Sequence, residues 1–146
     1  MSRASRVKIA GRSVGEWVLA SEALLLLAAF RVALALVPAR RILQIVAGGA
    51  DPMGEAPSEQ DRAIVVRVRW AVEAAVRHSA VRFVCFPQTL AGYVMLRRRG
   101  VRGTMVYGVA RSTTGKLIAH TWLMLGERCV LGGAASEEFT AVERWG

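Results

Sequence analysis

CFPQTLAGYVMLRRRG (residues 85–100) and TMVYGVA (residues 104–110) are separated by only three residues, and the hydrophobic period changes between them. The first stretch predicts a helix from about Phe86 to Arg99, with Gly100 as the residue that stops it. The second stretch is rich in β-branched and aromatic residues and predicts a strand. Helices that lead directly into strands indicate an α+β fold.

Strand signals continue to the end of the chain. Residues 112–116 predict a turn, and Leu117–Leu125 predicts a second strand. A tight turn at residues 126–128 leads into a third strand, Cys129–Leu131, which two glycines break. Phe139–Trp145 predicts a last short strand, so we expect an antiparallel meander.

Two further helices are expected before the cysteine. The Leu-rich run of residues 17–37 predicts a long helix that Pro38 ends or kinks. Apolar residues at three- and four-residue spacing predict another helix, which Asp61 or a residue just before it can cap and which runs to about His78. The stretch between them is rich in Gly, Pro and acidic residues and predicts a linker. We therefore divide the chain into an N-terminal helical segment (1–47), a linker (48–60) and a C-terminal domain (61–146).

The composition limits the class of protein. A chain of 146 residues forms one ordinary domain, and 53% hydrophobic residues with a mean hydropathy of +0.34 indicate an exposed apolar face, an interface or a membrane contact. Twenty basic against 11 acidic residues give a net charge of +9, which favours anionic partners. Two cysteines make no disulfide framework and agree with a reducing cytoplasm.

The Leu-rich run invites comparison with a membrane span. Its uninterrupted apolar part reaches only from Ala23 to Phe30, whereas a spanning helix needs about 20 such residues. Glu22 and Arg31 would each cost roughly 2.5–3.5 kcal/mol on insertion. We expect a cytoplasmic protein, with peripheral contact at the inner face of the membrane through Trp17–Val37 left open because Arg40 and Arg41 follow.

Cys85 stands where the helix of residues 86–99 begins. The free N–H groups and partial positive charge of a helix N-terminus stabilise a thiolate. The same N–H groups can hold the oxyanion of a tetrahedral intermediate, with Gln88 as a candidate second donor. The alternative is the commoner role of a lone cysteine, which is to pack as a small buried hydrophobe.

His120 lies inside the second predicted strand and shares a sheet face with Trp122. Beside the Cys85 helix it can act as general base and acid, with Trp122 supporting the imidazole or the oxyanion. A half-buried structural histidine is the alternative.

Thiol–imidazole pairs normally have a third group that orients the imidazole. The next strand, near residues 131–133, is the natural place and carries neither a carboxylate nor an amide. Glu127 in the turn before it, and Glu137 and Glu138 after it, are the candidates. A backbone carbonyl is the alternative.

Two other functions fit the residue pattern poorly. His78 and Cys129 would complete a four-ligand zinc set with Cys85 and His120, but no pair has the close spacing of zinc ligands, so we expect neither metal nor cofactor. A disulfide between the two cysteines has no further support. The run Arg97–Arg99 complements a helix dipole and has no interleaved aromatic residues, so we expect no nucleic-acid partner.

Four motifs follow one another in the C-terminal part: Cys-Phe-Pro-Gln-Thr-Leu (85–90), Arg-Arg-Arg-Gly-Val (97–101), Val-Tyr-Gly-Val (106–109) and Ala-His-Thr-Trp (119–122). By their order and spacing, the sequence from Val81 onward resembles the C-terminal domain of the lasso-peptide leader peptidases. This family is a transglutaminase-like, papain-related branch of bacterial thiol proteases. The Leu-rich helix is also similar to the family's upstream helix.

The resemblance implies a core of one helix and an antiparallel sheet, in which Cys85 attacks the bond between leader and core peptide. His120 would act as base and then as acid. Many members carry Asp as the third residue, aligned near Gly132, and this chain departs from that pattern.

Three partners are implied by the same resemblance. They are the leader–core precursor peptide, a leader-recognition protein that is separate because this chain lacks such a domain, and a macrolactam-forming cyclase. The competing hypothesis is a non-catalytic basic adaptor that binds a peptide or a membrane surface through the Leu-rich helix.

Overall fold

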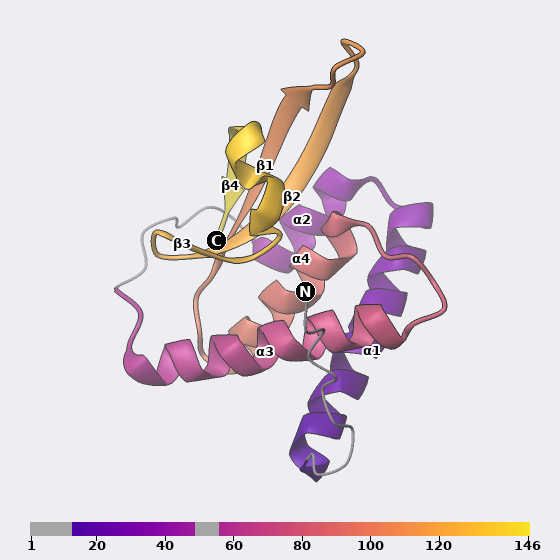
Figure 1. The fold of residues 1–146 in the computed structure, drawn as a ribbon. Coiled ribbons are helices and arrows are strands. Elements are labelled where there is room, and N and C mark those ends of the chain that lie inside the picture. Colours follow the sequence, from indigo (N-terminus) through magenta and orange to yellow (C-terminus); the bar gives the residue numbers. More distant parts are fainter. Residues whose placement is uncertain (1–12, 49–55) are drawn as a thin grey trace, which may run out of the picture.

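The computed structural model describes residues 13–48 and 56–146 of the chain. Within these residues, helices precede a four-stranded antiparallel sheet, which confirms the α+β prediction (Figure 1). The elements are α1 (Val14–Leu36), α2 (Ala39–Ala47), α3 (Glu59–His78), α4 (Cys85–Arg97), β1 (Thr104–Arg111), β2 (Leu117–Leu125), β3 (Arg128–Leu131), the 3₁₀ helix η1 (Gly133–Glu138) and β4 (Thr140–Trp145).

Side-chain caps fix where two of the helices begin. Ser13 caps α1 in a capping box with Glu16, and Ser58 caps α3 in the same way with Asp61. Asp61 therefore belongs to the cap as its third helical residue, and α3 begins inside the predicted linker. Residues 49–55 of that linker lie outside the described residues.

Pro38 ends the long helix as predicted, but a second helix follows it at once. Pro38 itself is the N-cap of α2, where its fixed φ is compatible with a helix start. Gly48, with φ of 65°, ends α2. The sequence prediction of a helical segment to residue 47 did not separate these two helices.

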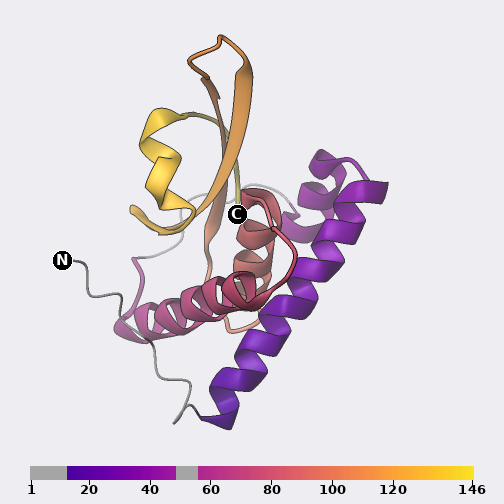
Figure 2. The ribbon, with the colours of Figure 1, turned by 45° about the vertical axis from the view of Figure 1, so that its right-hand side comes forward.

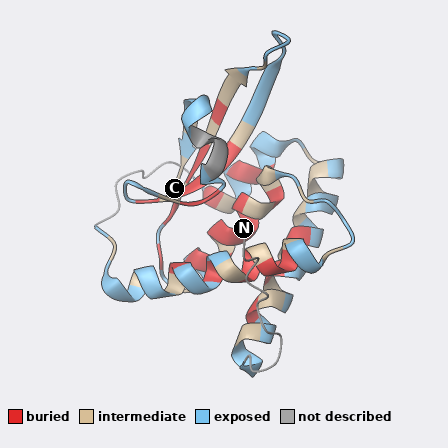
Figure 3. Ribbon diagram, in the orientation of Figure 1, coloured by how far each residue is buried: buried red, intermediate tan, exposed pale blue. Residues whose placement is uncertain are grey.

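α4 lies at the centre of the molecule, packed against the sheet on one side and against α1 and α3 on the other. Figure 2 shows α1 on the side of α4 that faces away from the sheet. Each of these layers supplies side chains that are fully buried: Ala23, Leu27, Val72, Leu90 and Leu123 (Figure 3). The N-terminal helices and the C-terminal part therefore share one core.

The sheet order is β3-β2-β1-β4. The predicted meander is right for β1, β2 and β3, but β4 pairs with β1 on the far side instead of following β3. η1, which packs against β2, carries the chain between the two edges. This order is that of a Greek key, in which the fourth strand returns beside the first.

α1 is long and apolar enough to cross a membrane by length and composition. Core helices of globular domains pass the same test. Here α1 buries Leu19, Ala23 and Leu27 against α3 and α4, while several large apolar side chains on its opposite face are exposed.

Candidate active site

Cys85 is the first residue of α4, and the N-terminus of this helix has no side-chain cap. Its N-cap residue is Val84, which has no side-chain oxygen, and Pro87 at the third helical position has no N–H. The amides of Cys85 and Phe86 have no hydrogen-bond acceptor among the described residues. The helix therefore presents two free N–H groups beside a half-buried, free thiol.

Two side chains fix the loop that leads into Cys85. Gln88 donates from Nε2 to the Phe83 carbonyl at 2.8 Å, and Arg31 of α1 donates to the Arg82 carbonyl at 3.1 Å. The Gln88 amide therefore holds the loop that precedes Cys85.

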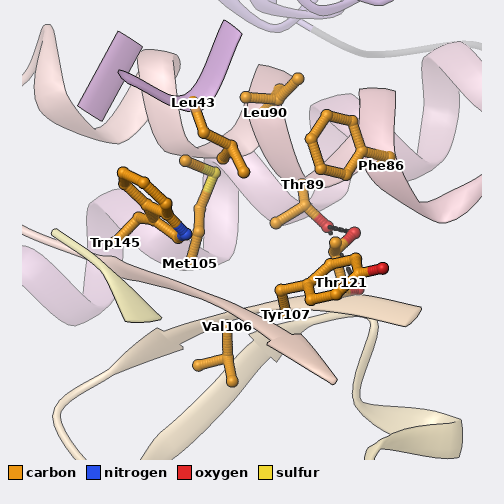
Figure 4. A pocket seen from close by; sticks show the side chains of 9 residues that line it. All are labelled: Leu43, Phe86, Thr89, Leu90, Met105, Val106, Tyr107, Thr121 and Trp145. Carbon is orange, nitrogen blue, oxygen red and sulfur yellow. Dashed lines mark hydrogen bonds between the residues drawn. The ribbon is translucent and has the colours of Figure 1, made fainter. Parts of the chain in front are cut away.

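A buried pair of threonines connects the first turn of α4 to β2 (Figure 4). Thr89 Oγ1 lies 2.9 Å from the Cys85 carbonyl oxygen, 3.2 Å from Thr121 Oγ1 and 3.3 Å from the Thr121 carbonyl oxygen. Thr89 is 2% exposed and Thr121 is 4% exposed. Because buried hydroxyls need partners, this pair fixes the position of α4 relative to β2, the strand that carries His120.

The same pair borders a cavity of about 10 Å³ between α4 and the sheet. Figure 4 shows Phe86 and Tyr107 at one side of it and Met105 and Trp145 at the other. A space of this size is at the lower limit for one water molecule, so it cannot hold a substrate side chain.

His120 is half-buried and has a carbonyl as its hydrogen-bond partner. Its Nε2 lies 2.7 Å from the Gly132 carbonyl oxygen. A carbonyl only accepts, so Nε2 carries the hydrogen and Nδ1 is left as the basic nitrogen. The ring also stacks on Trp122, with a centroid distance of 5.9 Å, and makes a tilted contact with Phe139 at 5.1 Å.

Gly132 can approach the imidazole because it has no side chain. Its φ is +76°, and a Cβ there would lie 2.8 Å from the Thr121 carbonyl oxygen. A side chain at this position would thus force the backbone away from β2 and take the carbonyl with it.

Cys85 and His120 approach the same stretch of β2 from different sides. Thr121 faces α4, so by strand alternation His120 and Trp122 face the opposite side, where Gly108 leaves room for the Trp122 ring. No hydrogen bond joins the thiol and the imidazole among the described residues. β3 pairs only with Leu123–Leu125, so at His120 β2 is the edge of the sheet and no further strand separates the two groups.

The three candidate orienting carboxylates lie elsewhere. Glu127 is in the β2–β3 turn, beyond Leu125 and so roughly 16 Å along the strand from His120. Glu137 and Glu138 are exposed in η1 and make no hydrogen bond to His120. Among the described residues, the hydrogen-bond partner of the imidazole is the Gly132 carbonyl.

The second cysteine has a different environment. Cys129 Sγ donates to the Leu131 carbonyl at 3.3 Å. Burial raises the pKa of the Cys129 thiol, against smaller lowering effects of the Leu131 backbone and of Arg69. Both thiols are free. The described residues contain no group of three or more metal-ligating side chains, and His78 is exposed at the end of α3.

The arginine run at the end of α4 makes contacts within the fold. Arg97 donates to the Val46 carbonyl at 2.7 Å, and Arg98 and Arg99 form ion pairs with Glu22 of α1 at 3.0 and 2.6 Å. These arginines therefore fasten α4 to α1 and α2.

Sequence reasoning did not identify Thr89, Thr121 or Phe139. The two threonines were visible as hydroxyls at positions that are otherwise apolar, four residues after Cys85 and one after His120. Phe139 gave no such signal because its contact with His120 depends on the path of η1.

A family model described as the transglutaminase-like superfamily matches residues 24–144, which cover α2, α3, α4, the sheet except the last residue of β4, and the second half of α1. Neither a curated protein nor a solved structure matches the chain.

Proposed function

Because the chain belongs to the transglutaminase-like superfamily, we propose that it is a cysteine peptidase that removes the leader from a ribosomally synthesised lasso-peptide precursor. Cys85 is the nucleophile, and His120 is the general base and acid. The reaction takes place in the cytoplasm and needs no cofactor. The precursor, a leader-recognition protein and a macrolactam-forming cyclase are the proposed partners.

The uncapped N-terminus of α4 carries this proposal. The amides of Cys85 and Phe86 point to no acceptor among the described residues, whereas α1 and α3 both begin with capping boxes. Unused amides next to a thiol favour the thiolate and can bind a developing oxyanion. A purely structural cysteine has no need of them.

The hydrogen bond of His120 supports the second assignment. With Nε2 bound to the Gly132 carbonyl, Nδ1 is free to accept the thiol proton. For the two groups to react, the imidazole has to swing past the edge of β2, which β3 leaves unpaired at His120. Catalytic hydrogen bonds often form only with substrate present, so the absent thiol–imidazole bond does not contradict this route.

The chemistry proceeds in two steps. The Cys85 thiolate attacks the carbonyl carbon at the leader–core junction, the amides at the α4 N-terminus bind the oxyanion, and the C–N bond breaks as His120 protonates the leaving amine. His120 then takes a proton from water, which hydrolyses the thioester and releases the leader. The Gly132 carbonyl stabilises the imidazolium in both steps.

The two cysteines provide a matched pair for the test. We expect Cys85→Ala to lower cleavage of the leader–core precursor by about 10⁴-fold or more, and Cys129→Ala to change it less than about threefold. The measurement is mass spectrometry of the products with the leader-recognition protein present. Cleavage by Cys85→Ala at the rate of the unmodified chain would show that Cys85 is not the nucleophile.

A basic adaptor is the second candidate, and the exposed apolar face of α1 favours it. Such an adaptor would bind the precursor or the cyclase without cleaving peptides. It predicts that Cys85→Ala leaves every binding and maturation step unchanged, so the same variant separates the two functions.

A further inference from the structure

The outward face of α1 is apolar along its whole length. Its large exposed side chains are between 42% and 80% exposed, and we call them the outer stripe: Val14, Trp17, Val18, Leu24, Leu25, Val32 and Leu36. They recur at three-, four- and seven-residue spacing and follow a helix roughly 34 Å long. The solvent side of a surface helix normally carries charged residues. This face carries apolar residues instead, so it is suited to contact with an apolar surface.

The charged residues of α1 do not interrupt the stripe. Glu16 belongs to the cap with Ser13, Glu22 is paired with the two arginines that directly follow α4, and Arg31 donates to the Arg82 carbonyl. Each is directed to the cap, to the rest of the domain or to the border of the stripe. The outer stripe is consequently uncharged from end to end.

α1 cannot leave the domain to enter a membrane as a span without loss of the core. Ala23 and Leu27 are fully buried against α3 and α4, and Glu22 is ion-paired to Arg99 at 2.6 Å. Figure 3 shows this division, with buried residues on the side of α1 that meets the other helices and exposed residues on the outside. The helix can therefore contact an apolar layer only through its outer stripe, while its inner face stays packed against α3 and α4.

Exposed basic side chains follow the outer stripe at its C-terminal end. Arg40 and Arg41 lie on α2 and are exposed, and Arg40 is 3.9 Å from Glu143. Arg98 lines the groove beside Trp17 and is paired with Glu22. In the sequence, four basic residues precede the helix: Arg3, Arg6, Lys8 and Arg12. A second copy of this chain would place like charges against each other, whereas an anionic lipid surface offers negative headgroups beside an apolar layer.

We propose that the outer stripe of α1 lies in the interface of an anionic membrane, parallel to its plane, with the arginines of α2 at the headgroups. This surface is separate from Cys85 and serves to hold the enzyme at the membrane. Leu25, at the middle of the stripe and 72% exposed, is the residue buried deepest among the acyl chains.

The test is co-sedimentation of the full chain with vesicles of phosphatidylcholine, with or without phosphatidylglycerol. We expect binding to the anionic vesicles that weakens with salt. Leu25→Glu should lower it at least about tenfold because it places a carboxylate in the apolar layer. The Arg40→Gln/Arg41→Gln pair should lower it roughly fivefold per residue.

Val66→Glu is the matched control because Val66 is 67% exposed but lies on α3. It should bind as the unmodified chain does, and circular dichroism should show both glutamate variants folded. Cys85→Ala should also bind normally, so the result does not depend on peptidase activity.

Three outcomes would overturn the proposal. The first is no binding of the unmodified chain to anionic vesicles. The second is equal binding by Leu25→Glu and Val66→Glu. The third is a lipid-free dimer that Leu25→Glu dissociates in light scattering, which would assign the stripe to a second copy.

Discussion

Cys85 and Cys129 have the same side chain and a similar half-buried environment, but the backbone around them differs. Cys85 begins a helix whose first amides are free, and Cys129 lies in a strand where its sulfur donates to the Leu131 carbonyl. Burial raises the pKa of the Cys129 thiol, which keeps it protonated. The backbone position therefore distinguishes the candidate nucleophile Cys85 from the structural thiol Cys129, although the two are similarly exposed.

The largest expected effect comes from removing the His120 imidazole, which is proposed to act on Cys85 and not on Cys129. We expect His120→Ala to lower precursor cleavage by about 10³-fold, since general acid–base catalysis supplies a factor of this order. His78→Ala, at an exposed position at the end of α3, is the control and should leave the rate unchanged. A rate for His120→Ala within a few fold of the unmodified chain would remove the imidazole from the mechanism.

Direct measurement of the two thiols sharpens the comparison. At neutral pH we expect iodoacetamide to modify Cys85 at least about tenfold faster than Cys129, as judged by peptide mass spectrometry. Because the pKa of Cys129 is raised, its thiolate forms only at higher pH, and the ratio of rates should narrow as the pH increases. Equal rates at neutral pH would mean that the helix start confers no reactivity.

The smallest expected effect concerns the threonine pair that positions α4. Thr89→Val removes hydrogen bonds worth about 1 kcal/mol net, so kcat should fall roughly three- to tenfold with KM nearly unchanged. The modification rate of Cys85 should fall with it while that of Cys129 stays constant. Thr89→Ser keeps the hydroxyl and should restore both values, an outcome that a simple packing role does not predict.

Much of the fold could be predicted because its signals are local. The bounds of β2 were predicted at Leu117 and Leu125, where turn residues flank a run that is apolar except at His120 and Thr121. The end of α1 followed from Pro38. The start of α3 was predicted at Asp61 or a residue just before it, and the structure shows Ser58 as the cap with Asp61 as the third helical residue.

The position of β4 and the partner of His120 could not be predicted in this way. η1 packs against β2 and carries the chain past it, and β4 then pairs with β1. No residue of β4 itself indicates which edge of the sheet it joins. The imidazole's partner is a main-chain oxygen of Gly132, and main-chain groups leave no trace in residue type. The expectation of a carboxylate near residues 131–133 therefore led to glutamates that do not contact the imidazole.

The Gly132 carbonyl also affects how the site can be lost through mutation. Every amino acid has a carbonyl, so no codon change at position 132 deletes the acceptor of His120; it can only move it. The positive φ of Gly132 makes such movement easy to cause, because any side chain there presses on the Thr121 carbonyl. Substitutions of residues that shape this turn should therefore inactivate the site even where those residues do not contact the imidazole.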